Sequence, residues 1–200
     1  WEFNVDKANQ LLEAAGWKRG NDGVRTRDGR QLKFVFQTSI NAPRQKCQQI
    51  IKAACQKAGI DLELKSVTAA VFFSSDVANP DTFTKFYADL EMFNNSGGPD
   101  PWFFMNQFVS WEIASKDNKW QGRNVSRWRN AEYDEIYRSL SAEFDPVRRA
   151  AKFIRLNELI IDNRVAMPLV NRSEVGAAAH RLRMTLSAWD SHLWLLKDWY

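Results

Sequence analysis

The sequence predicts an α/β fold in which a mixed, mostly parallel sheet is flanked by helices. A strand at residues 32–38, a long helix at 43–58 and a strand at 61–67 follow one another with short connections. Such a unit almost always makes a right-handed crossover between parallel strands. A further strand at residues 88–93 ends at the turn-rich loop NNSGGPDP. Loops at strand ends and before helix N-termini are where open α/β sheets bind ligands.

Composition narrows the class of protein. The 200 residues are 44% apolar, which suits one sizeable domain or two small ones. A net charge of +4 is a mild bias and not the footprint of a dedicated nucleic-acid binder. Nine Trp and thirteen Phe supply flat surface for a core and for stacking on planar groups. Neither a membrane span nor a signal peptide is predicted, so we expect a cytoplasmic protein or a piece of an exported one.

The cysteines and histidines predict no metal site. Cys47 and Cys55 lie eight residues apart in one predicted helix, about 12 Å along its axis, which is beyond the reach of a disulfide. We therefore expect two free thiols. With no CxxC motif and no His cluster, neither a zinc site nor a cofactor is expected.

The first 60 residues contain two capped helices and a ribbon. Asn4 is the expected N-cap of the first helix and Gly16 its stop, and Pro43 opens the second helix. Asp22-Gly23 and Asp28-Gly29 predict a small exposed hairpin with solvated arginines. The apolar faces of the two helices are expected to bury Ala8, Leu11, Leu12 and Ala15, and Cys47, Ile50, Ile51, Ala54 and Ala58.

The middle of the chain carries the NNSGGPDP loop and the aromatic residues around it. Residues 69–75 and 80–86 are expected to form short helical pieces before the strand at 88–93. Asp100 is the expected N-cap of a short helix that begins at Pro101. Phe103, Phe104 and Phe108, at helical spacing, are expected in the core, whereas Asn94 to Gly98 are hard to explain as core.

The last 70 residues predict a helical hairpin, a final strand and an aromatic tail. Asn130 caps a helix at 131–143, and Asp145-Pro146 caps another that runs to about Asn163. The second helix is expected to bury Ala150, Ala151, Ile154, Leu159 and Ile161. Residues 165–171 predict an edge strand because they contain Pro168.

Two other functions are weighed against ligand binding. Trp120 and Trp128 interleave with Lys119, Arg123, Arg127 and Arg129, a pattern that suits single-stranded nucleic acid; a loop that packs its Trp and solvates its Arg is favoured. A hydrolase would use Asp100 with His180 or His192, but neither histidine has the spacing of a catalytic or metal motif. No catalytic residue is therefore assigned, and we expect no enzyme.

Six segments resemble, in order, the C-terminal part of the family 5 extracellular solute-binding proteins, the dipeptide, oligopeptide and nickel receptors of ABC importers. These segments are VDKANQLLEAAGWKRGNDG, KAGIDLELKSV, DLEMFNNSGGPDPWFF, NVSRWRNAEYDEIY, DPVRRAAKFIRLNELIIDN and VAMPLVNR. The resemblance implies one periplasmic-binding-protein-like (type II) lobe over residues 1–200, with the tail at 180–200 packing on a first lobe that this chain lacks. It also implies a periplasmic or extracellular location, ABC permease partners, and neither nucleic-acid binding nor direct insertion into a membrane.

The resemblance implies a peptide-like or other small polar solute. In peptide-binding relatives an acidic residue, three positions ahead of the acid of the Asp-Pro pair, takes the amino terminus of the peptide. That position is Gly97 here, so a free ammonium would lose its partner. Neutral donors and acceptors suit a polyol, a sugar conjugate or a blocked peptide, on which Trp111 is expected to stack. The candidate ligand-binding residues are Phe93, Asn94, Asn95, Ser96, Gly97, Trp111 and Asn171.

Overall fold

The computed structural model describes residues 2–95, 100–171, 177–184 and 195–200. The chain divides into two compact units. The first consists of Trp1–Asn94 and Ala114–Gln121, and the second of Asn95–Ile113 and Gly122–Tyr200. Each unit buries apolar residues of its own.

The first unit begins with a helix and a small antiparallel ribbon. Helix α1 (Val5–Ala14) is capped by Asn4, whose side-chain oxygen accepts a hydrogen bond from the Lys7 N–H, as predicted. Strands β1 (Lys18–Arg19), β2 (Arg25–Arg27) and β3 (Arg30–Gln31) pair antiparallel in that order, which confirms the predicted hairpin. The apolar face of the helix was predicted wrongly as buried. Leu11 is 62% exposed, and no residue of α1 is fully buried.

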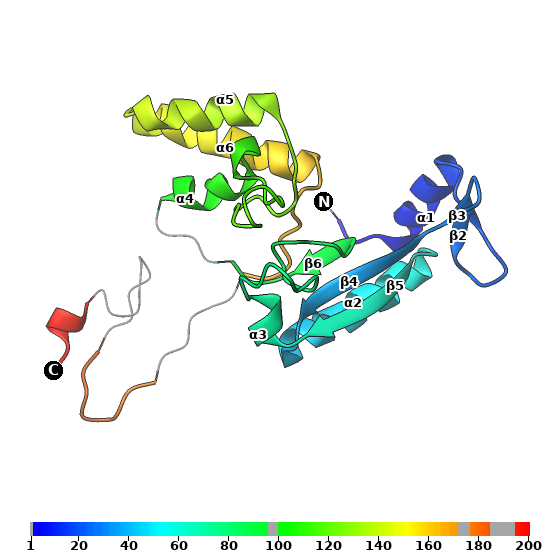
Figure 1. Ribbon diagram of the computed structural model, residues 1–200, viewed down its shortest axis with the longest axis horizontal. Helices are drawn as coiled ribbons and strands as arrows, with labels where there is room; N and C mark the ends of the chain where they lie inside the picture. Colours follow the sequence, from blue (N-terminus) through cyan, green and yellow to red (C-terminus); the bar gives the residue numbers. More distant parts are fainter. Residues whose placement is uncertain (1, 96–99, 172–176, 185–194) are drawn as a thin grey trace. The chain divides into compact units, whose positions relative to one another are not determined.

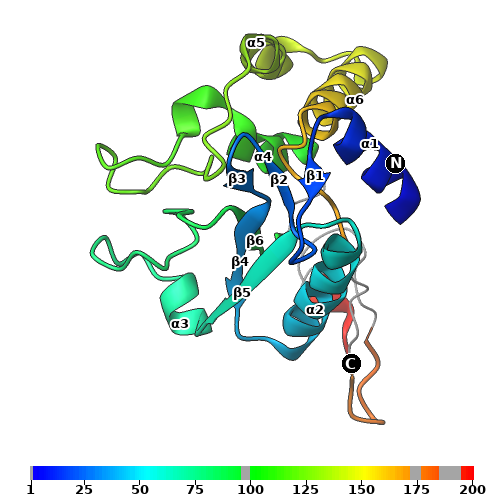
Figure 2. The same cartoon turned by 90° about the vertical axis from the view of Figure 1, so that its right-hand side faces the viewer.

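The parallel sheet of the first unit is the predicted strand–helix–strand unit with one strand added. Strand β4 (Lys33–Ser39) leads into α2 (Ala42–Lys57) and then β5 (Asp61–Val67), and β4 and β5 pair in parallel over their whole length. Strand β6 (Leu90–Met92) adds in parallel to the other edge of β4, so the order is β5-β4-β6. Helix α2 lies along the β4–β5 pair (Figures 1 and 2). The parallel sheet is thus confirmed.

The buried face of α2 agrees with the prediction at Ala58 and differs from it at Ile50. Ile50 is 69% exposed and Gln48 is buried instead. The Gln48 side chain donates to the Phe36 carbonyl oxygen at 2.7 Å, which ties the helix to the sheet by a polar contact. Cys47 and Cys55 are both free, as expected. Helical spacing alone could not choose between the two neighbouring faces.

A short helix and a run of turns follow β5. Helix α3 (Ala69–Phe72) forms at the start of the expected piece, but residues 80–86 form turns and not a helix. The Asp81 carbonyl oxygen accepts a hydrogen bond from the Gln37 side chain, and the Asp81 carboxylate pairs with Lys65 at 2.6 Å. The Asp81 carbonyl oxygen and carboxylate therefore bond to side chains of the sheet. Such contacts compete with the hydrogen bonds between residues i and i−4 that a helix needs.

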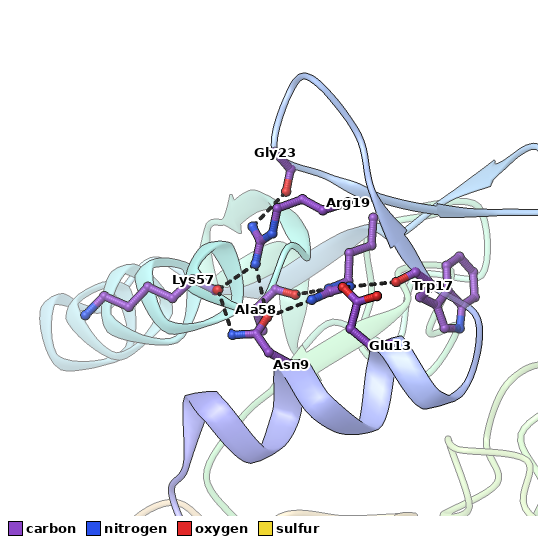
Figure 3. Close-up of polar contacts among 8 residues, drawn as sticks. Asn9, Glu13, Trp17, Arg19, Gly23, Lys57 and Ala58 are labelled. Atoms are coloured by element: carbon purple, nitrogen blue, oxygen red, sulfur yellow. Dashed lines mark hydrogen bonds and ion pairs between the residues drawn. The ribbon is translucent and has the colours of Figure 1, made fainter.

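A buried arginine joins three segments of the first unit (Figure 3). The Arg25 side chain is 2% exposed. Its guanidinium donates to the carbonyl oxygens of Ala58 and Trp17 and to the side-chain oxygens of Glu13 and Asn9, at 2.5–2.9 Å. The hydrogen bond from this guanidinium lowers the pKa of the Glu13 carboxyl. The contacts connect α1, the ribbon and the C-terminal end of α2.

The second unit is helical in the part of it that the structure describes. Asp100, Asn130 and Asp145 cap their helices as predicted, each side chain accepting from a backbone N–H of the first turn. The elements are α4 (Pro101–Met105), η1 (Asn106–Phe108), η2 (Ser110–Glu112), α5 (Ala131–Ser139), η3 (Leu140–Ala142), α6 (Pro146–Asp162) and η4 (Leu196–Asp198). Helices α5 and α6 lie side by side and confirm the predicted helical hairpin (Figure 1).

The core of the second unit forms between α4, α5 and α6. It consists of Met105, Phe108, Val109, Tyr133, Tyr137, Leu140, Leu156, Leu159 and Ile160. Helix α6 buries Leu159, as predicted, together with Leu156 and Ile160, which were not predicted, whereas the predicted Ile154 is exposed. Phe104 packs against this core, as expected.

The predicted strand at residues 165–171 is not formed in the described structure. Val165 and Ala166 pack against the core, whereas Met167, Leu169 and Val170 are exposed. No described strand pairs with this segment. A strand forms only where another strand pairs with it, and the sequence of a single segment does not show whether such a partner is present.

We predict that Gly59→Ala destabilises the protein more than Gly29→Ala. Both glycines have φ near +80°, at +83° and +76°, so a side chain costs about 1–2 kcal/mol at either position. A Cβ at Gly59 would lie 2.6 Å from Cγ of the anchored Arg25, whereas a Cβ at Gly29 meets nothing within 4 Å. Overpacking should add at least about 1 kcal/mol at Gly59. Urea unfolding midpoints measure the difference, and equal shifts for the two variants would contradict it.

Candidate ligand-binding surface

The candidate residues of the first unit lie at the end of its sheet. Phe93 and Asn94 directly follow β6. The Phe93 ring is half-buried and lies 5.3 Å from the ring centre of Phe83. This pair continues a row of phenylalanine rings through Phe73 and Phe72, with centres 4.9–6.0 Å apart. Asn94 is exposed.

The candidate residues of the second unit have different neighbours. The Asn95 side chain donates to the Gln107 side-chain oxygen at 2.5 Å. Asn171 is exposed. Trp111, 46% exposed, belongs to a cluster of aromatic rings. Ser96 and Gly97 lie outside the described residues, so their predicted roles remain predictions.

An exposed group of rings surrounds Tyr137 in the second unit. The Trp102 ring stacks on the Tyr137 ring at 5.5 Å with an interplanar angle of 18°, and the Trp111 ring lies 6.0 Å from Tyr137. The Tyr137 hydroxyl donates to the Trp102 carbonyl oxygen at 3.1 Å. Trp102 and Phe103 are both partly exposed. We call the exposed Trp102, Phe103 and Trp111, together with the buried Tyr137, the aromatic platform.

Phe103 was predicted wrongly as core. It is 50% exposed, while Phe108 is buried as expected. Helix α4 has only five residues, and successive side chains on a helix point about 100° apart, so Phe104 and Phe103 cannot both face the core fully.

Two arginines lie over rings of the platform. The guanidinium carbon of Arg123 is 3.9 Å from the Phe103 ring centre, and that of Arg138 is 4.4 Å from the Trp111 ring centre. Both side chains belong to exposed residues. Each arginine therefore combines a positive charge with an apolar face.

A buried amide holds the loop that carries this surface. Asn124 is fully buried, and its side-chain nitrogen donates to the carbonyl oxygens of Val109 and Trp128 at 3.0 and 2.9 Å. Its backbone N–H donates to the Glu112 carbonyl oxygen, and its side-chain oxygen accepts from Ser126. These bonds fix the chain on both sides of Trp111. Sequence reasoning gave Asn124 no role, because no local pattern marks an amide that bonds to distant carbonyls.

Burial disfavours ionisation of Tyr137. Desolvation is the main cause that raises the pKa of Tyr137 to about 12. Arg123 lowers this pKa, and Glu112 and Asp100 raise it. The hydroxyl is neutral at neutral pH, as any tyrosine hydroxyl is, and it donates to the Trp102 carbonyl oxygen.

Asp100 and Trp128, which the hydrolase and nucleic-acid alternatives would use, both have structural partners. One Asp100 carboxylate oxygen accepts from the Trp102 N–H and the other pairs with Arg149 at 2.7 Å. Trp128 packs edge-on against Tyr133 in the core. These contacts match the capping and packing roles that were favoured.

The described residues contain neither a metal-binding cluster nor a membrane-spanning helix. No group of three or more His, Cys, Asp or Glu side chains in this part of the chain could hold a metal ion. None of the described helices is both long and apolar enough to cross a bilayer.

The fold is an α/β architecture similar to that of periplasmic binding proteins. Residues 1–116 match the bacterial extracellular solute-binding proteins, family 5 (middle), and the chain belongs to this family. Family membership confirms the resemblance that the six sequence segments predicted.

Known relatives of the chain are considerably longer. It is 22% identical over 174 residues to the oligopeptide-binding protein AppA of Bacillus subtilis (strain 168), covering 82% of this chain and 28% of AppA. The crystal structure of the oligopeptide-binding protein of Thermus thermophilus, complexed with a pentapeptide, matches with a TM-score of 0.72 and 26% identity, covering 84% of this chain and 30% of that one. NikZ of Campylobacter jejuni, in complex with Ni(L-His), matches in fold with a TM-score of 0.68 and 19% identity. The match covers 81% of this chain and 31% of NikZ.

We predict that Asn124→Asp destabilises the second unit by roughly 3 kcal/mol, because a buried carboxylate would face two carbonyl oxygens with no donor between them. Asn171→Asp is the matched control: the same change at an exposed residue should stay within about 0.5 kcal/mol. Urea unfolding, followed by tryptophan fluorescence, measures both variants. A similar midpoint for Asn124→Asp and the wild type would rule out this role of the amide.

Proposed function

We propose that the chain is the C-terminal ligand-binding lobe of a substrate-binding protein of an ABC importer. It captures a peptide-like or other small polar solute and delivers it to the permease subunits. Membership of the family supports this, as do the ligands named for the relatives: a pentapeptide for the Thermus thermophilus protein and Ni(L-His) for NikZ. The chain spans 30% or slightly more of these solved proteins, which is consistent with one lobe of a larger molecule.

In this proposal both compact units belong to one lobe, and the tail at 180–200 packs on the part of the protein outside this chain. The protein works in the periplasm or outside the cell. Its mechanism is binding without turnover: hinge closure buries the solute between lobes, and the closed form docks on the importer. The hydrolase alternative has weaker support, because both oxygens of the Asp100 carboxylate already have partners.

The exposed aromatic platform is the observation that carries the proposal. Solute sites combine aromatic surface with a few placed polar groups. Trp111 supplies such a surface, and Phe93, Asn94, Asn95, Ser96, Gly97 and Asn171 are proposed to complete the site. Trp102, Phe103 and Trp111 lie partly exposed in one cluster, which supports their contact with a ligand.

Native mass spectrometry of the full-length protein, purified from its own host without added solute, tests the function. We expect a bound small molecule that is lost on mild denaturation. If the purified protein carries nothing and binds no member of a peptide, sugar and polyol panel in calorimetry, the proposed function is wrong.

We predict that Trp111→Ala weakens solute binding by about tenfold or more, because stacking on an aromatic ring contributes on the order of 1–3 kcal/mol. Phe144→Ala is the control, since Phe144 is the more exposed ring at 89% and lies outside the platform. Calorimetry with the solute identified by mass spectrometry compares the two variants. Equal affinities for Trp111→Ala and Phe144→Ala would exclude Trp111 from the site.

A further inference from the structure

We propose that the aromatic platform selects solutes in which a carboxylate group stands beside an apolar or planar part. The inference rests on the proposed function, since it names the chemical class of the solute. Arg123 and Arg138 are the residues that would hold the carboxylate, and the rings beneath them would contact the apolar part.

Both guanidinium groups are available for a ligand. Among the residues that the structure describes, neither side chain makes a hydrogen bond or ion pair, and each only lies over a ring. Two other arginines of the same unit behave differently: Arg149 pairs with Asp100, and Arg155 donates through two nitrogens to Glu132. The N–H donors of Arg123 and Arg138 therefore remain available to a ligand, whereas those of Arg149 and Arg155 are already bonded to carboxylates.

Stacking prepares the guanidinium groups for a planar anion. A guanidinium over a ring face is held by cation–π attraction and keeps its N–H edge available. That edge matches the two oxygens of a carboxylate in a bidentate pair, which is among the stronger polar contacts in proteins. The side chains are pre-positioned by Phe103 and Trp111, so less conformational entropy is lost on binding.

The local charge favours an anion over a cation. Two acids lie close enough to Tyr137 to raise its pKa, Glu112 and Asp100. Asp100 pairs with Arg149, and the Asp134 carboxylate, on α5, accepts from the Ser110 N–H, whereas neither Arg123 nor Arg138 has an ion-pair partner among the described residues. The sequence that precedes Asp100, NNSGGP, contains no acid. A solute with a free ammonium group would find little to pair with here, whereas a carboxylate would.

The platform arginines themselves report on binding. The full-length protein is labelled with ¹⁵N-arginine, and the Nε–H signals of Arg123 and Arg138 are followed by NMR. The probes are N-acetylglycine, N-acetylleucine, N-acetylphenylalanine and N-acetylaspartate, each against the corresponding amide without a carboxylate. We expect saturable shifts of both signals with at least one acid and about tenfold weaker binding of its amide, since a hydrogen bond to a charged group contributes this order of free energy.

Variants assign the effect to the two side chains. Arg123→Gln together with Arg138→Gln should lower affinity for the binding acid by about tenfold or more. Arg30→Gln removes the same charge from an exposed side chain outside the platform and should change nothing. Unchanged affinity in the double variant, equal binding of acids and amides, or no saturable shift with any acid would each overturn the proposal.

The outcomes separate this inference from the proposed function. A full-length protein that carries a neutral solute and binds it equally well in the double variant would keep the function and overturn the carboxylate selectivity. The opposite result is also possible: acids bind at the platform, but the protein carries no solute from its host and does not support uptake. That result would keep the carboxylate selectivity and overturn the importer role. Arginine signals that shift with an acidic partner protein but with none of the acids would overturn selection of a small solute.

Discussion

A polar side chain buried away from water must find its hydrogen-bond partners inside the protein, and this constraint organises both compact units. Arg25 meets it by donating to groups from α1, the ribbon and the end of α2. Asn124 meets it through the Val109 and Trp128 carbonyl oxygens. Leaving such a group unpaired costs about 1–3 kcal/mol, so each of these residues ties together the segments that supply its partners.

The two anchors have different consequences for function. Arg25 stabilises the frame of the first unit, next to the parallel sheet whose strand ends carry Phe93 and Asn94. Asn124 holds the loop that presents Trp111 and positions the chain beside Arg123. The candidate binding surface of the second unit thus depends on a residue that does not itself reach the surface. Substitutions at such positions would change binding through the placement of other side chains.

The exposed rings and their arginines form a surface with both apolar and positive character. A ring without a charge would accept many flat molecules, and a charge without a ring would accept many anions. Arg138 over Trp111 and Arg123 over Phe103 combine the two requirements within one cluster. Specificity would then arise from the pairing of a carboxylate with an apolar group in the same solute.

The sequence by itself determined features that depend on neighbours in the chain: the helix caps at Asn4 and Asp100, the hairpin turns and the parallel strand–helix–strand unit. These follow from side chains that bond to the nearby backbone and from apolar periodicity. Tertiary structure alone decided which helix face is buried, as Ile50 illustrates, and that Phe103 is exposed beneath Arg123. Burial at these positions depends on which distant segments pack against them. A short stretch of sequence does not contain that information.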